Sequence, residues 1–284
     1  GMVKSSGLTL LELCSLMKKC KPDMVLTIAD RYETLPIAMA AAYMNIFIAH
    51  TQGGEITGSI DESVRHATTK LSHIHFPATK KSFRNIIRMG EKKENVHLTG
   101  CPSLDFIPKK IPKLNKNFFK KTSFVGDNIN FKLPYIVVLQ HSVTTEYEKT
   151  IKQIDETIKA VQKLNLQVVW LWPNIDAGSE IISKKIRSLR ETQNIKKVAF
   201  YKNFEPLDFL RLINYSKCLV GNSSAAIREG SYLGIPAVNI GSRQNFRERG
   251  DNVIDAKHNS EEIYKAIIKK IKIKSYKKNK LFGD

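Results

Sequence analysis

Short apolar runs alternate with amphipathic segments along most of the chain. The apolar runs are typical of buried strands in a parallel sheet, and the segments between them carry apolar residues at helical spacing. The predicted strands are residues 24–28, 46–49, 74–76, 96–98, 135–139, 167–171, 198–200, 217–220 and 237–240. The predicted helices are residues 8–17, 34–43, 61–71, 80–89, 151–164, 181–191 and 206–216. This order predicts an α/β fold in which helices cover both faces of parallel sheets.

A stretch rich in proline and lysine, residues 108–117, interrupts the alternation and predicts a linker. We therefore expect two Rossmann-type, doubly wound domains, residues 1–112 and residues 113–284. The N-terminal domain begins with a predicted helix, whereas a doubly wound domain normally begins with a strand. We expect the first strand and helix of that domain to be absent from this chain.

Charge and composition narrow the classes of function. The chain has 46 Lys and Arg against 27 Asp and Glu, a net charge of +19. Its lysines form runs at 80–93, 109–121 and 265–280 with few aromatic residues between them, which predicts a solvated basic surface and no specific nucleic-acid site. No apolar run approaches the ~18 residues of a membrane span, and the four cysteines lack metal-ligand spacing. We expect a cytoplasmic protein without a metal or other cofactor.

Polar or glycine-rich residues follow five of the predicted strands. Ligands of doubly wound sheets bind where the carboxyl ends of the strands meet, so these residues predict one site. They are Asp30-Arg31, His50 to Glu55, Gln140 to Ser142, Trp172 to Asn174, and Gly221 to Ser224.

The last of these segments predicts an anion site. A strand ending at Gly221 passes through Asn222-Ser223-Ser224 into a helix-compatible segment. Backbone N–H groups at such a junction favour a phosphate, and Glu229 could accept a hydrogen bond from a ribose hydroxyl. An ordinary serine-capped helix explains the same residues equally well.

Candidate acid and base groups lie in the first domain. Asp30 could be a general base, with Arg31 beside it as a planar fork for a phosphate. Glu55 ends a turn with two glycines and is either catalytic or fixes the turn. Asp61 and Arg65 lie on one face of a predicted helix, an arrangement that surface ion pairs also produce.

Four further candidates lie in the second domain. His141 comes directly after a strand, where it could contact a pyrophosphate or act as an acid, although a lone histidine is more often structural. Asn174 could read a uracil edge or stabilise its turn. Arg243 and Arg247 follow the last predicted strand and could face the same site.

Five blocks of the sequence resemble the hydrolysing UDP-N-acetylglucosamine 2-epimerases. This family includes bacterial enzymes of sialic and related nonulosonic acid synthesis and the epimerase half of the animal bifunctional epimerase/N-acetylmannosamine kinase. The blocks are HTQGGEITGSIDESVRHATTKLSHIHF, GCPSLD, LQHSVTTE, WPNIDAGS and GNSSAAIREGSYLGIPAVNIGSRQNFRERGDNV. The resemblance implies a GT-B-like fold of two Rossmann-type domains with UDP in the cleft, usually as a homo-oligomer.

The resemblance also implies roles for individual residues. It puts the sugar and the chemistry on the N-terminal domain and UDP on the C-terminal domain. The implied ligands of the diphosphate and ribose are Ser223, Ser224 and Glu229, and the implied ligands on the nucleotide side are Asn174 and Arg243. The resemblance places Arg31 and His141 near the phosphates. It places Asp30, Asp61 and Arg65 near the sugar. Gln52 departs from the family, because several members have Glu there. An amide can orient a sugar but cannot titrate, so acid–base work would fall to Asp30, Asp61 and Glu55.

The implied reaction is epimerisation at C2 with hydrolysis. UDP leaves by anti elimination to a 2-acetamidoglucal, and water then adds to give N-acetylmannosamine. Three alternatives stay open at this point: the same reaction on UDP-2,4-diacetamido-2,4,6-trideoxyglucose of the legionaminic acid route, a GT-B glycosyltransferase, and an inactive UDP-sugar-binding fragment.

Overall fold

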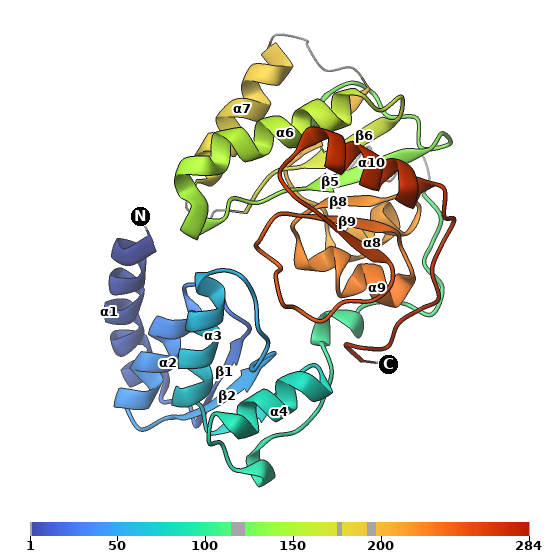
Figure 1. The fold of residues 1–284 in the computed structure, drawn as a ribbon. Coiled ribbons are helices and arrows are strands. Elements are labelled where there is room, and N and C mark those ends of the chain that lie inside the picture. The colour runs from blue at the N-terminus through green and yellow to red at the C-terminus, as the bar shows by residue number, and fades with distance from the viewer. Residues whose placement is uncertain (1, 115–122, 175–177, 192–196, 284) are drawn as a thin grey trace. The chain divides into compact units, whose positions relative to one another are not determined.

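The computed structural model describes residues 2–114, 123–174, 178–191 and 197–283, which form two compact units. Unit 1 comprises Gly1–Pro102 together with Asn245–Arg247 and Phe282–Asp284, and unit 2 comprises Ser103–Gln244 and Glu248–Leu281 (Figure 1). The predicted linker at 108–117 runs past residue 114 into a stretch outside the described residues. The domain boundary after residue 112 therefore stays a prediction.

Unit 1 is a parallel three-stranded sheet with helices packed against it. The strands lie in the order β1-β2-β3 and are β1 (Met24–Ile28), β2 (Phe47–Thr51) and β3 (Ile74–Phe76). The helices are α1 (Met2–Cys20), α2 (Thr34–Tyr43), α3 (Ile60–Leu71) and α4 (Lys80–Arg88). Ala38, Ala40 and Ala41 of α2 are buried, and their small side chains let α1 and α3 pack closely on either side (Figure 1).

One face of β1 departs from the predicted cover on both faces. The side chains of Met24, Leu26 and Ile28 are exposed, whereas Thr27 on the opposite face is buried. Among the described residues, this face of β1 has no helix over it. Unit 1 thus follows the expected strand–helix order, with one face of β1 left open.

Unit 2 is a seven-stranded sheet of order β10-β9-β8-β5-β6-β7-β4, in which β4 alone is antiparallel to its neighbour. The strands are β4 (Phe124–Gly126), β5 (Tyr135–Leu139), β6 (Gln167–Leu171), β7 (Val198–Tyr201), β8 (Leu219–Gly221), β9 (Ala237–Ile240) and β10 (Val253–Ala256). The α-helices are α6 (Thr150–Gln162), α7 (Ser179–Glu191), α8 (Pro206–Asn214), α9 (Glu229–Leu233) and α10 (Ser260–Ile271). Short 3₁₀ segments of unit 2 are η3 (Thr144–Lys149) and η4 (Ser224–Ala226), whereas η1 (Lys93–Asn95) belongs to unit 1 and η2 (Pro102–Leu104) crosses the boundary.

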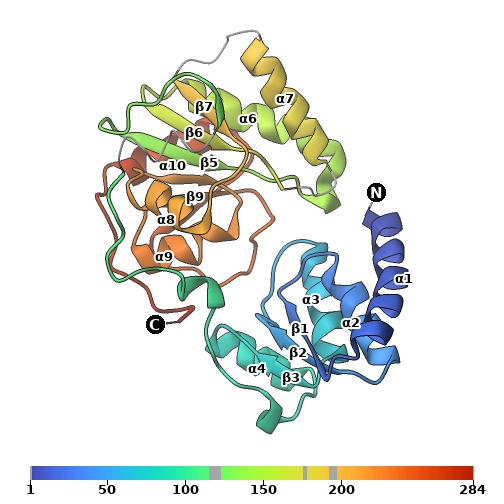
Figure 2. The same ribbon diagram turned by 180° about the vertical axis from the view of Figure 1, so that it is seen from behind.

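Both faces of the unit 2 sheet carry a core, as the apolar strands predict. Ile136 and Val138 of β5 pack into a cluster with side chains of α6, α7 and α10. Tyr135 and Val137 belong to a second cluster, which includes side chains of α8. Figure 2 shows α8 on its face of the sheet. Because consecutive β5 residues are buried on alternating sides, the strand reads as one uninterrupted apolar run.

The strand order of unit 2 reverses between β5 and β8. From β5 the chain adds β6 and β7 on one side, and it then returns to place β8, β9 and β10 on the other. Ligands of doubly wound sheets bind at this reversal, outside the carboxyl ends of the two central strands. The segments that begin at Gln140 and Asn222 lie at that point.

The structure corrects several local predictions. Residues 96–98 are not a strand, because Val96 makes only an isolated bridge to His75 and Leu98 is exposed. Strands β4 and β10 and helix α10 were not predicted. Helix α10 overlaps the lysine-rich run. A stripe of buried side chains that includes Ile263 and Ile267 packs on the sheet, and Lys265 and Lys269 are exposed.

No helix in the described part of the chain is both long and apolar enough to cross a bilayer.

Gly221 closes β8 in a conformation that side chains rarely adopt. Its φ is 132°, and a Cβ atom there would overlap the carbonyl oxygen of Leu139 on β5. The neighbouring strands therefore require glycine at this position.

We expect Gly221→Ala to destabilise unit 2 by about 3 kcal/mol or more, since it adds a backbone clash to an unfavourable φ. Urea unfolding followed by tryptophan fluorescence measures this, because Trp170 and Trp172, the two tryptophans of the chain, belong to unit 2. Gly7→Ala in α1 is the control: its Cβ meets no atom within 4 Å, so it should leave that transition unchanged. A Gly221→Ala transition at the parent's urea concentration would contradict the expectation.

Candidate functional site

The side chain of Asn222 joins the ends of the two central strands of unit 2. Its Nδ2 donates to the carbonyl oxygen of His141 at 2.8 Å, and the backbone N–H of His141 donates to Oδ1 at 2.7 Å. The backbone N–H of Asn222 donates to the Leu139 carbonyl at 3.0 Å. Asn222 is fully buried. The loops that follow β5 and β8 are therefore fixed to each other at the strand reversal.

A third loop of unit 2 contacts the same residue. The carbonyl oxygen of Asn222 accepts hydrogen bonds from Gln244 Nε2 at 2.9 Å and from Arg243 Nη1 at 3.3 Å. Arg243 was among the residues expected at the site, and Asn222 was expected there as part of the segment Gly221 to Ser224. Gln244 was not expected, and no role was predicted for the Asn222 side chain.

His141 is a buried, neutral imidazole. Its Nδ1 accepts a hydrogen bond from the backbone N–H of Asn174 at 3.1 Å, which assigns the ring proton to Nε2. Burial, and next the positive charge of Arg243, lower the pKa of His141 to about 3. The ring can donate a hydrogen bond through Nε2 near pH 7, but an imidazolium acid, one of the alternatives for this residue, does not fit the site.

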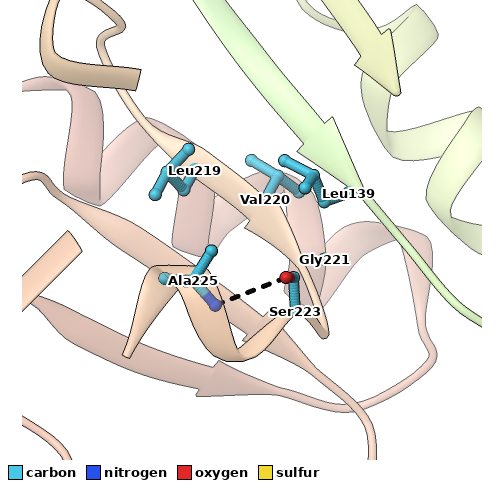
Figure 3. Close-up of a pocket in the computed structure, with 7 residues that line it drawn as sticks. Leu139, Leu219, Val220, Gly221, Ser223 and Ala225 are labelled. Carbon is cyan, nitrogen blue, oxygen red and sulfur yellow. Dashed lines mark hydrogen bonds between the residues drawn. The ribbon is translucent and has the colours of Figure 1, made fainter. Parts of the chain in front are cut away.

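The Gly-Asn-Ser-Ser segment does not lead straight into a long helix. The 3₁₀ turn η4 comes first, and α9, which begins at Glu229, has only five residues. Ser223 Oγ accepts from the Ala225 N–H at 3.3 Å and so caps η4 (Figure 3). Of the two predicted roles, helix cap and anion site, this hydrogen bond corresponds to the cap. The Ser223 hydroxyl can still donate its proton to a further acceptor. Any anion bound here would rely on hydroxyls, peptide N–H groups and Arg243, with little from a helix dipole.

A small pocket lies beside this turn, between the strand ends and η4. Among the residues that line this pocket, Ser223 is the one with a polar side chain, so the pocket does not suit a diphosphate. It is lined by Leu139, Leu219, Val220, Gly221, Ser223, Ala225 and Ala226 (Figure 3).

In unit 1, a buried guanidinium holds the carboxylate that follows β1. Arg65 of α3 is fully buried, and its Nε donates to Asp30 Oδ2 at 3.1 Å while Nη2 donates to the same oxygen. Nη1 donates to the backbone carbonyl of Glu55, and Nη2 also lies 3.4 Å from Thr57 Oγ1. A surface ion pair does not describe Arg65, because its partner lies on another element. The Asp30 side chain keeps 20% of its surface exposed.

A second guanidinium, that of Arg247, reaches these groups from residues 245–247, the short segment that belongs to unit 1. Arg247 Nη2 lies 2.9 Å from Glu55 Oε2 and 3.7 Å from Asp30 Oδ2. The side chains of Arg247 and Glu55 are 5% and 3% exposed. Two carboxylates and two guanidiniums thus form one cluster within unit 1.

His50 fixes the backbone directly before Asp30. Its Nε2 lies 2.9 Å from the carbonyl oxygen of Ala29, which can only accept, so Nε2 carries the proton and Nδ1 accepts from Thr69 Oγ1 at 3.2 Å. Burial lowers the pKa of His50 to about 4, so the ring is neutral. Ala29 has a φ of 58°, a left-handed turn that these contacts hold in place.

Asp61, Arg31 and Gln52 are the other expected residues of unit 1. Asp61 is half-buried in the first turn of α3. Arg31 is exposed and makes a two-point ion pair with Glu33, at 2.9 and 3.2 Å. Gln52 is buried with a φ of 60°, and its Nε2 donates to Cys101 Sγ at 3.4 Å. Its amide is therefore engaged inside unit 1.

Taken unit by unit, the structure brings many of the expected residues together. In unit 1 the carboxylate of Asp30 and the backbone of Glu55 meet at Arg65. In unit 2 His141 is joined directly to Asn174 and, through Asn222, to the loop that carries Arg243.

Comparisons with known proteins agree on one family. The family model described as UDP-N-acetylglucosamine 2-epimerase matches residues 1–284. A hydrolysing UDP-N,N'-diacetylbacillosamine 2-epimerase of Legionella pneumophila is 36% identical over 255 residues, 90% of this chain and 66% of that protein. A UDP-N-acetylglucosamine 2-epimerase of Neisseria meningitidis is 33% identical over 266 residues, 92% of this chain and 67% of that protein. The chain thus spans about two thirds of the length of these relatives.

The fold is that of solved GT-B-like epimerases. The structure of a Methanocaldococcus jannaschii UDP-GlcNAc 2-epimerase, in complex with UDP-GlcNAc and UDP, matches with a TM-score of 0.79 at 18% identity. The match covers 100% of this chain and 78% of that one. The predicted fold class, α/β and GT-B-like, is confirmed.

The buried, neutral His141 makes the stability of unit 2 depend on pH. Its pKa is about 3 when folded and near 6.5 when unfolded, so below pH 6.5 the unfolded chain binds more protons. We expect His141 to remove about 2 kcal/mol of the unfolding free energy between pH 7 and pH 5. In His141→Asn, the unfolding free energy measured by tryptophan fluorescence should fall less between pH 7 and pH 5 than in the parent, by that amount.

The control for this measurement is His97→Asn, since His97 is exposed and lies in unit 1. It should leave the pH dependence of the tryptophan transition as it is in the parent. An equal loss of unfolding free energy between pH 7 and pH 5 in the parent and in His141→Asn would show that His141 does not titrate as the structure requires.

Proposed function

Because the chain belongs to the UDP-N-acetylglucosamine 2-epimerase family, we propose that it catalyses the hydrolysing epimerisation of UDP-N-acetylglucosamine at C2, releasing UDP and N-acetylmannosamine. The observation that carries this proposal is the carboxylate of Asp30. It lies at the end of a parallel strand, is held by the fully buried Arg65, and is still partly exposed. A carboxylate that is fixed in place and open to solvent on one side suits proton transfer.

The substrate dictates the order of the steps. The C2 proton is poorly acidic, because the acetamido group joins C2 through nitrogen. Departure of UDP from C1 therefore runs ahead and gives C1 oxocarbenium character, after which a carboxylate removes the C2 proton. The 2-acetamidoglucal is then protonated at C2 from the opposite face while water adds at C1. The balance is one substrate and one water in, UDP and the manno-configured sugar out.

The proposed leaving-group site is in unit 2. The hydroxyls of Ser223 and Ser224 and the guanidinium of Arg243 are donors for the diphosphate, and His141 adds a neutral Nε2 donor. Asn174 and Glu229 are proposed to bind the nucleoside. Hydrogen-bond donors that are already fixed before UDP departs stabilise its developing charge without reorganisation.

The proposed proton-transfer groups are in unit 1. Two groups must act on opposite faces of the sugar, and we assign them to Asp30 and Asp61. Arg65 orients Asp30. The Nε2 of Gln52 is engaged by Cys101, so the proposed contact of Gln52 with the sugar is through its amide oxygen, which does not titrate. Arg31, exposed and paired with Glu33, is proposed to add positive charge near the phosphates.

A second substrate is favoured by one observation. The Legionella pneumophila relative, 36% identical, is named for hydrolysing 2-epimerisation of UDP-N,N'-diacetylbacillosamine. The chemistry at C1 and C2 is the same for both sugars, so the difference lies in contacts to C4 and C6. Either product fits the synthesis of sialic or related nonulosonic acids, and we propose that the enzyme acts there as a cytoplasmic homo-oligomer.

Incubation with each UDP-sugar in D₂O tests the reaction. We expect UDP release together with an N-acetylmannosamine-type product that carries deuterium at C2, because the proposed glucal takes that hydrogen from solvent. Proton NMR of the product separates the alternatives. Simple hydrolysis gives the gluco sugar without deuterium, and a glycosyltransferase gives transfer to an added acceptor. If neither UDP-sugar releases UDP, the proposal is wrong.

Asp30→Asn tests the proposed base. We expect UDP release to fall by about 100-fold or more, while the Kd for UDP measured by calorimetry changes little, because the proposed UDP ligands other than Arg31 belong to unit 2. Asp23→Asn is a matched control, since Asp23 is an exposed carboxylate directly before β1. An Asp30→Asn variant with parental turnover would remove Asp30 from the proton-transfer pair.

A further inference from the structure

Three residues of the C-terminal part of the chain belong to unit 1. Residues 245–247 group with unit 1, whereas Gln244 and Glu248 on either side group with unit 2. Phe246 in the middle is 73% exposed and has a φ of 62°, which is unfavourable for a bulky residue. Strain of this kind persists where a neighbouring group must be held in place. The residue that this turn delivers into the interior of unit 1 is Arg247.

Arg247 completes a balanced set of charges. We call Asp30, Glu55, Arg65 and Arg247 the carboxylate–guanidinium cluster. Arg65 contacts Glu55 through its backbone carbonyl, whereas Arg247 contacts the Glu55 carboxylate at 2.9 Å. Both guanidiniums approach Oδ2 of Asp30. Two negative and two positive groups therefore offset one another in a nearly closed interior.

The exposures within the cluster separate the two carboxylates. Glu55 is 3% exposed and has the arginine against it, so it is poorly placed to reach a sugar. Asp30 is 20% exposed. Without Arg247, the cluster would hold two carboxylates and one guanidinium, and Arg65 contacts only the backbone of Glu55. Like charges in a buried site disfavour ionisation of both carboxylates. His50, beside Ala29, is neutral and does not replace the lost charge.

We propose that Arg247 is a positioning residue for the epimerase reaction: it keeps Glu55 as a buried counter-ion and steadies Asp30, so that Asp30 exchanges the C2 proton and Glu55 does not. This rests on the proposed function for its catalytic part. It assigns Glu55, one of the acid–base candidates, to the structure of the cluster. Arg247 itself, 5% exposed, acts through the carboxylates and not on the substrate.

A double-mutant cycle tests the assignment. Arg247→Met should lower kcat about 100-fold with KM within about three-fold of the parent, and it should move the acidic limb of the kcat/KM profile to higher pH. Glu55→Gln alone should lower kcat by less than about five-fold. Because the amide needs no counter-ion, the double variant Arg247→Met/Glu55→Gln should recover at least about ten-fold of the loss. A double variant as slow as Arg247→Met would mean that Arg247 contacts the substrate, which overturns the proposal.

The matched control is Arg249→Met, which removes a guanidinium two residues further on. Arg249 pairs with Asp255 and lies in unit 2, so this variant should keep parental kcat and the parental pH profile. A loss as large as that of Arg247→Met would show a general effect of charge on this loop, and that would also overturn the proposal.

Amide hydrogen exchange separates this inference from the proposed function. Exchange in residues 52–57 should quicken in Arg247→Met and return toward the parental rate in the double variant, whether or not the chain turns over a UDP-sugar. Failure of UDP release with this exchange pattern present rejects the proposed function and keeps the structural role of Arg247. Unchanged exchange in Arg247→Met rejects the role.

Discussion

The charge of Arg65 must be matched where it is fully buried, and the local structure of unit 1 follows from that requirement. One guanidinium ties α3 to the end of β1 through Asp30 and to the turn after β2 through the Glu55 carbonyl. The same turn carries the Glu55 carboxylate, and Arg247 forms an ion pair with it. Carboxylates that are fixed in this way are oriented before any substrate arrives, which is the form of organisation that catalysis of proton transfer requires.

Unit 2 reaches a similar rigidity with neutral groups. Asn222 bonds to the His141 backbone and accepts from Gln244, so three loops share one buried side chain and its peptide. A neutral His141 leaves Arg243 as the positive charge of this set. The contrast suits the proposed division of labour, because proton transfer needs carboxylates whereas a departing diphosphate needs donors.

The strand ends were predictable from the sequence because they are local: a polar residue directly after an apolar run marks the carboxyl edge of a parallel sheet. The partner of Arg65 was not, since helical spacing points to Asp61 and the structure selects Asp30, 35 residues away. Strand β10 was not predicted, because Asp255 interrupts its apolar run. A helix was predicted after Gly-Asn-Ser-Ser, but its late start and short length were not, because that segment resembles the direct start of a longer helix. Contacts between distant segments leave no periodic signal.

Unit 1 is discontinuous along the chain, and this limits how members of the family can be recombined. A piece ending after residue 102 would retain Glu55 but lack Arg247, and it would lose the Phe282 carbonyl that accepts from the Cys101 N–H at 2.6 Å. A chimera of two relatives joined at a single crossover would pair the carboxylates of one parent with the guanidinium of the other. A chimera must therefore take residues 1–102, 245–247 and 282–284 from the same parent, because these three separate segments form one unit.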